Sequence, residues 1–101
     1  MKASVTEEGN RLILGGVVTA DNALALRQQG ERWLSSRTRG DRLSVDLSAV
    51  ESASSVLLSL LLCWLREARR MNLTLAVKGA SGQLLELSRL NGVSHWLTGP
   101  A

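Results

Sequence analysis

The sequence predicts a single α/β domain built on a mixed sheet of four to five strands with three to four helices, in the order β-β-α-β-α-β-α. Short segments in which apolar and polar residues alternate are separated by longer segments whose apolar residues recur every three or four positions. Each strand-helix-strand passage implies parallel pairing, whereas the first two strands are close enough to form an antiparallel hairpin. A length of 101 residues, 45% of them apolar and 21% charged, is typical of one globular domain, so residues 1–101 are expected to form a single domain.

The chain is predicted to begin with a β-hairpin followed by a helix. The segment Leu12-Ile13-Leu14 is expected to form a strand that pairs with residues 3–7 through a turn at Gly9-Asn10. Asp21 is a plausible N-cap for the helix that follows, which is expected to end near Arg37. Its core side consists of residues at helical spacing, namely Ala23, Leu26, Gly30, Trp33 and Leu34.

The next strand and helix have the most regular patterns in the sequence. Residues 43–47 alternate apolar and polar side chains, and the alternation stops at residues 48–52, which predicts a strand followed by a loop. A helix is expected over residues 54–71. Its apolar side consists of Leu57, Leu60, Leu61, Trp64, Ala68 and Met71.

A further strand-helix step completes the predicted order. Residues 73–77 alternate again, and Ser81 is positioned to cap a helix that extends to Leu90. Asn91-Gly92 is a typical stop signal for that helix. The tail over residues 93–100 is expected either to add a short edge strand or to cover the core.

The helix over residues 54–71 carries a second stripe of side chains opposite its apolar side. The stripe consists of Ser55, Ser59, Leu62 and Arg66, with Leu58 and Cys63 at its flanks. Small hydroxyls mixed with apolar side chains are unusual on a helix face that contacts only water, so the stripe predicts a protein contact. Leu58 and Leu62 are the expected apolar anchors.

The start of this helix allows two interpretations, which are compatible with each other. In the first, Ser54 caps the helix and Ser55 satisfies free N–H groups of its first turn. In the second, Ser55 lies at the positive end of the helix dipole, at a position where a partner docks or a phosphate is added.

Other residue patterns give no support for catalysis, a metal or a cofactor. His95 has no cysteine or acid at a metal-binding or triad spacing, and Asp46 has no second carboxylate at a fixed spacing. Residues 79–82 lack the Lys-Ser/Thr pair of a phosphate-binding loop. A net charge of only +3 and the absence of Phe and Tyr argue against a nucleic-acid partner. We therefore expect a protein that is not an enzyme.

The sequence also predicts a cytosolic location without direct insertion into a membrane. Cys63 is the only cysteine, and the first eight residues lack the apolar core of a signal peptide. The longest apolar stretch, residues 56–65, is well short of the roughly 20 residues that a membrane-spanning helix needs.

Residues 45–58, VDLSAVESASSVLL, resemble the central motif of STAS domains, which occur in sulfate transporters and anti-sigma factor antagonists. In that motif an apolar strand ends in Asp-Leu-Ser, and a short loop leads to Asp-Ser/Thr-Gly or Asp-Ser/Thr-Ser/Thr-Gly at the start of a leucine-rich helix. The likeness continues through residues 73–77, the Gly79 turn and residues 84–90, so it covers most of the chain and implies a STAS-like fold. Two positions depart from the motif, because Ser54 replaces the usual Asp and Val56 the usual Gly.

The chain is also similar to the small cytoplasmic STAS subunit of the Mla system, an ABC transporter that moves phospholipid between the membranes of Gram-negative bacteria. This likeness lies in the length, the short hairpin and the leucine-rich helix. It implies a non-catalytic subunit, peripheral to the inner membrane, that binds and stabilises or regulates the transporter's ATPase subunit, in a complex with permease and substrate-binding subunits. The implied contact consists of Ser54, Ser55, Leu58, Ser59, Leu62 and Arg66.

Likeness to the anti-sigma factor antagonists implies an alternative function. In that case Ser55 would be the hydroxyl that a partner kinase phosphorylates, and the acid next to it would assist the exchange. Because Ser54 replaces that acid, the sequence favours a fixed docking surface, on which Ser55 is small and uncharged, over a phosphorylation switch.

Overall fold

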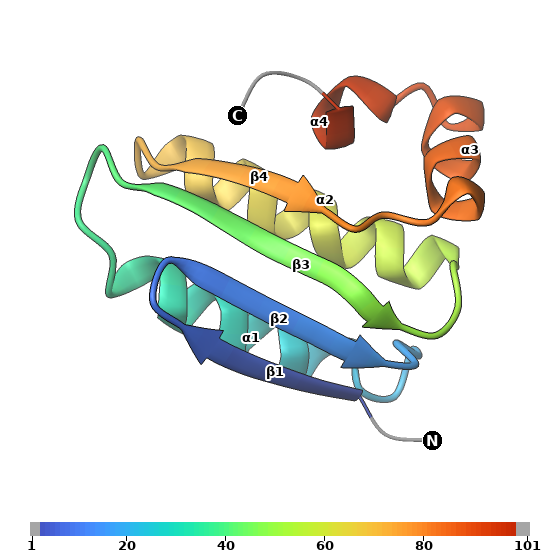
Figure 1. Cartoon of the computed structure of the whole chain (residues 1–101), viewed down its shortest axis with the longest axis horizontal. Coiled ribbons are helices and arrows are strands. Elements are labelled where there is room, and N and C mark those ends of the chain that lie inside the picture. The colour runs from blue at the N-terminus through green and yellow to red at the C-terminus, as the bar shows by residue number, and fades with distance from the viewer. Residues whose placement is uncertain (1–2, 99–101) are drawn as a thin grey trace.

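The computed structural model describes residues 3–98, which form a β-sheet with its main helices on one face (Figure 1). Within these residues there are four strands, in the spatial order β1-β2-β3-β4, and four helices. The strands are β1 (Ala3–Glu8), β2 (Arg11–Gly16), β3 (Arg42–Val50) and β4 (Thr74–Lys78). The helices are α1 (Ala23–Ser35), α2 (Ser55–Arg70), α3 (Gly82–Leu90) and α4 (Ser94–Thr98). The predicted α/β class and element order are confirmed, with α4 added at the end.

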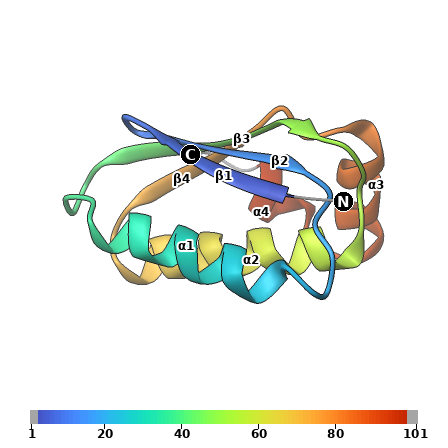
Figure 2. The same ribbon diagram turned by 90° about the horizontal axis from the view of Figure 1, so that it is seen from below.

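The sheet is mixed, as the sequence predicts. β1 and β2 form the antiparallel hairpin, with Val5 opposite Leu14, and β3 pairs parallel with both β2 and β4. Figure 2 shows α1 and α2 side by side beneath the sheet, while the described helices leave its other face uncovered. The strands therefore bury one face only, which explains why β2 and β3 alternate buried and half-exposed residues.

β3 is longer than predicted, because the break in alternation at Ser48 is a bulge and not the end of the strand. Ile13 of β2 lies opposite Asp46, but Gly15 lies opposite Ala49, so β3 contains one extra residue between the two pairs. The carboxylate of Asp46 accepts a hydrogen bond from the backbone N–H of Ser48 at 2.9 Å. This bond stabilises the bulge, and pairing with β2 resumes up to Val50.

α1 begins one residue later than predicted, with Asn22 and not Asp21 at the N-cap position. The Asn22 side chain does not cap the first turn. It accepts a hydrogen bond from Thr19 N–H at 2.8 Å and donates one to Val17 C=O at 2.9 Å. The side chain therefore holds the preceding loop, which is a common alternative use of asparagine near a helix start.

The tail forms helix α4, so the expectation of an edge strand is wrong and the alternative, a cover for the core, is confirmed. Leu97 is only 6% exposed and belongs to the core cluster. Residues 99 and 100 of the predicted tail lie outside the described residues.

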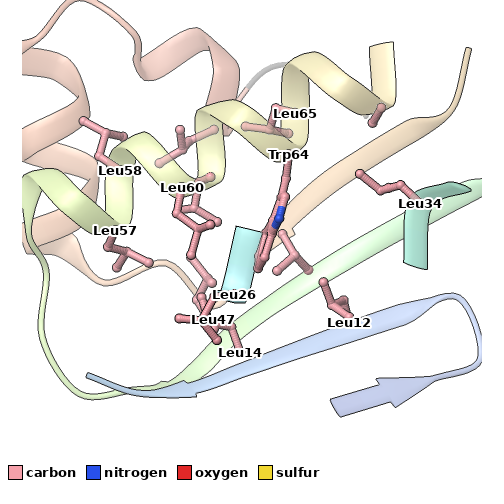
Figure 3. Close-up of a cluster of buried hydrophobic side chains, with 14 of the residues drawn as sticks. Leu12, Leu14, Leu26, Leu34, Leu47, Leu57, Leu58, Leu60, Trp64 and Leu65 are labelled. Atoms are coloured by element: carbon pink, nitrogen blue, oxygen red, sulfur yellow. The ribbon is translucent and has the colours of Figure 1, made fainter. Parts of the chain in front are cut away.

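The core fills the space between the sheet and the α1/α2 pair. Leu12, Leu14 and Leu47 extend from the strands toward the leucines and the tryptophan of α2 (Figure 3). All the predicted core residues of α2 are buried except Met71, which lies at the C-cap and is half-buried.

Gly30 allows α1 and α2 to approach each other closely. A methyl group at Gly30 would overlap the indole ring of Trp64. The indole N–H of Trp64 donates a hydrogen bond to the Arg27 carbonyl, at 3.1 Å. The glycine therefore leaves room for the Trp64 ring, and the indole hydrogen bond connects α2 to α1.

Candidate partner-binding site

The start of α2 is fixed by Ser54, as predicted. Ser54 has an extended backbone, and its hydroxyl oxygen accepts a hydrogen bond from the N–H of Leu57 at 3.1 Å. Ser55 is the first helical residue, and its side chain is exposed without a hydrogen bond to any other residue of the described chain. The two serines therefore differ: Ser54 is used by the fold, and Ser55 is available to a partner.

The bulge of β3 lies against the turn that follows β4. Gly79 has a positive φ of 73°, and a side chain there would approach the backbone N of Ser48 to 2.9 Å. Ser81 then caps α3 by accepting a hydrogen bond from Leu84 N–H at 3.1 Å. The close approach at Gly79 thus places the starts of α2 and α3 at the same end of the sheet, as Figure 1 shows.

Asp46 has a structural role in this arrangement. Hydrogen bonds from Ser48, reinforced by the Arg11 guanidinium 3.7 Å away, lower the pKa of the Asp46 carboxyl below its usual value. Residues 3–98 contain no cluster of three or more His, Cys, Asp or Glu side chains that could hold a metal ion. The geometry agrees with an aspartate that stabilises the bulge of β3.

The described residues beside the start of α2 enclose only a small cavity. Its volume is about 60 Å³, and its walls come from β3, the loop after it and the first turns of α2 and α3. That space accommodates a few water molecules.

The predicted stripe does lie on the outer side of α2. Ser55, Ser59 and Arg66 are exposed, and Leu62 is half-buried among them. We refer to these four residues as the α2 stripe. It combines two hydroxyls, one apolar side chain and one positive charge along the outer side of the helix.

Leu58 does not flank the α2 stripe as expected, because it is only 4% exposed. Its side chain points toward the C-terminal helices (Figure 3). Leu65, which lies two turns further along the same flank of α2, is only 7% exposed. The helical wheel assumes one buried direction, whereas α2 packs on the sheet and also on α3. This second contact buries Leu58, so it is not available as a surface anchor.

Sequence reasoning missed Trp96, which borders the α2 stripe. The guanidinium carbon of Arg69 lies 4.2 Å from the centroid of the Trp96 ring, and that of Arg66 lies 5.9 Å from it. These cation–π contacts connect α4 to the C-terminal half of α2. No local pattern indicates them, because they depend on where α4 packs.

None of the helices in the described residues is both long enough and apolar enough to cross a membrane.

The charged side chains of α2 lie along its outer side and at its C-terminal end. Arg70 pairs with Glu67, which raises the pKa of Arg70 and lowers that of Glu67. Arg66 and Arg69 form no ion pair with a described carboxylate, and both remain exposed.

Comparison with known proteins agrees with the fold and with the motif. A family model described as "Mlab, STAS domain" matches residues 1–99. No curated protein sequence matches the chain.

Two solved structures illustrate the similarity of fold. An anti-sigma factor antagonist from Mycobacterium paratuberculosis has a TM-score of 0.65 and 20% identity, covering 96% of this chain and 82% of that chain. A STAS domain anti-sigma-factor antagonist from Planctomyces limnophilus has a TM-score of 0.61 and 16% identity, covering 94% of this chain and 86% of that chain. At these identities the structures establish a shared fold, while the family model extends over nearly the whole sequence. The chain therefore belongs to the STAS-domain family, and within it matches the Mlab type.

Proposed function

We propose that this chain is a non-catalytic STAS subunit that binds the ATPase subunit of a phospholipid ABC transporter and stabilises or regulates it. In this role it is a cytoplasmic protein, peripheral to the inner membrane through its partner, in a complex with permease and substrate-binding subunits. The family match supports the proposal, since the matching model is of the Mlab type.

The observation that carries the proposal is the composition of the α2 stripe. Leu62 is half-buried between exposed hydroxyls and Arg66, so one partner surface that covers the stripe would desolvate an apolar side chain surrounded by polar ones. This arrangement of an apolar centre and a polar rim is typical of protein interfaces. Ser55 lies at the end of the stripe, where an added negative charge would enter a desolvated contact.

A test is co-expression of the chain with candidate transporter ATPases, followed by purification through a tag on the ATPase. We expect the wild-type chain to co-purify in a constant ratio, and Ser55→Glu to reduce the recovered complex at least about tenfold because a buried unpaired charge is costly. Thr6→Glu is the matched control, since Thr6 lies on an exposed position of β1, away from α2. Loss of complex with both variants, or with neither, would argue against the α2 stripe as the contact.

A second candidate function is that of an anti-sigma factor antagonist. The free, exposed hydroxyl of Ser55 at the start of α2 favours it, because a phosphate at a helix N-terminus is electrostatically favourable. Mass spectrometry of the protein isolated from its native cells distinguishes the two functions. A phosphate on Ser55, added by an anti-sigma kinase, supports the antagonist, whereas an unmodified Ser55 in a complex with an ATPase supports the transporter subunit.

A further inference from the structure

A groove of about 650 Å³ runs along the outer edge of β4, apart from the α2 stripe. Its walls are the segment from Leu73 to Val77, the C-terminal half of α2 with Leu65 and Arg69, and Trp96 of α4. Leu97 also lines the groove. On its other side, Leu97 lines a separate hollow beside Lys78. Figure 1 shows that β4 is the outermost strand on this side, with α4 beside its C-terminal end.

The floor of the groove presents backbone groups that the fold leaves unpaired. Thr74 N–H donates to Asp41 C=O, at 3.0 Å, so the backbone groups of Thr74, and of every second residue after it, face β3. The N–H and C=O groups of Leu75 and Val77 therefore face outward. No described residue forms a hydrogen bond with them, although both residues are half-buried. Unpaired edge groups of this kind are a template for an additional strand.

The charges around the groove are positive. Arg69 lines it, and none of its lining residues is acidic. Arg69 stacks on Trp96, which leaves the N–H groups at the edge of its guanidinium free to bind a carboxylate. Arg66 lies over the same ring and adds a second positive charge. The groove is thus complementary to a negatively charged ligand.

We infer that this groove binds an extended acidic segment of a partner protein, which adds to the sheet as a strand beside β4. The backbone of the segment pairs with the outward-facing groups of Leu75 and Val77. Its apolar side chains cover Leu65 and Trp96, and a carboxylate pairs with Arg69. Backbone pairing supplies affinity in such complexes, and side-chain contacts supply selectivity. The inference does not depend on which protein binds the α2 stripe.

The probe is a synthetic peptide of alternating glutamate and valine, added to the full chain labelled with ¹⁵N. We expect amide hydrogen exchange at Leu75 and Val77 to slow about tenfold or more at saturation, because both N–H groups gain partners. The same peptide methylated on alternate backbone nitrogens, and a peptide with lysine in place of glutamate, are the controls. Both should bind at least about tenfold more weakly, because the first lacks strand donors and the second has the wrong charge.

Variants of the chain test the role of Arg69 separately. Arg69→Ala should weaken peptide binding about five- to tenfold, while Arg32→Ala, on the exposed side of α1, should leave it unchanged. The inference is overturned if the acidic peptide fails to bind at millimolar concentration or if the lysine peptide binds as tightly as the acidic one. It is also overturned if binding leaves hydrogen exchange at Leu75 and Val77 unaltered. Protection confined to residues 55–66 would also overturn it, because the peptide would then occupy the α2 stripe.

Discussion

At the scale of single residues, the contact between Gly30 and Trp64 decides how closely the two main helices pack. Alanine is the better helix former by about 1 kcal/mol, yet a methyl group at Gly30 would overlap the buried indole. The sequence places Gly30 correctly on the core side of its helix. It does not reveal that the facing position belongs to a tryptophan.

We predict that Gly30→Ala destabilises the protein by about 1–3 kcal/mol, because the ring or the helix must shift to accept the added group. Gly82→Ala is the matched control, since a side chain at Gly82 in the first turn of α3 meets no atom within 4 Å. Urea denaturation followed by circular dichroism measures both. Equal stability of Gly30→Ala and the wild type would contradict the close contact.

A second residue-scale prediction concerns the pH dependence of Asp46. Its pKa is lowered in the folded state by the hydrogen bonds from Ser48 and the charge of Arg11, so its stabilising effect is present above its unfolded pKa of about 3.9 and is lost as the pH falls through the folded pKa. Wild type should therefore be more stable than Asp46→Asn at neutral pH, and the difference should shrink near pH 3. A difference that stays constant between these pH values would show that the carboxylate charge does not stabilise the bulge.

At the scale of elements, some features of α2 could be predicted from the sequence and others could not. Its boundaries, its cap at Ser54 and its main apolar side follow from helical periodicity and from the chemistry of serine at a helix start. The burial of Leu58 does not follow, because periodicity identifies the side that faces the sheet but not a flank covered by α3. The bulge in β3 and the helix α4 escaped prediction for a similar reason, since both depend on tertiary contacts.

The two leucines on the outer half of α2 should respond differently to truncation. Leu58→Ala should destabilise the fold by about 2–4 kcal/mol, since it removes a buried side chain. Leu62→Ala should cost less than about 1.5 kcal/mol of stability, because Leu62 is only half-buried, but should weaken ATPase binding about fivefold or more. Thermal denaturation and calorimetric titration measure the two effects. If Leu62→Ala binds the ATPase as tightly as the wild type does, Leu62 is not the anchor.

At the scale of the whole molecule, the fold exposes two surfaces that we propose as contacts for partners. The α2 stripe lies on the outer side of α2, and the groove lies along the outer edge of β4. Trp96 lines the groove, and its ring centroid lies 5.9 Å from the guanidinium carbon of Arg66 in the stripe. The element order and the α2 stripe were predictable from local patterns. The groove was not, because it exists only where β4, α2 and α4 meet.

The proposed contact between the α2 stripe and the ATPase of a phospholipid transporter can be tested by site-specific photocrosslinking in native cells. A photoreactive amino acid replaces Ser59, which is exposed in the middle of the stripe, or in a control replaces Thr6, which is exposed on β1. We expect a crosslink to the transporter ATPase from position 59 and none from position 6. A crosslink from position 59 to an anti-sigma factor, or equal crosslinking to the ATPase from both positions, would contradict it.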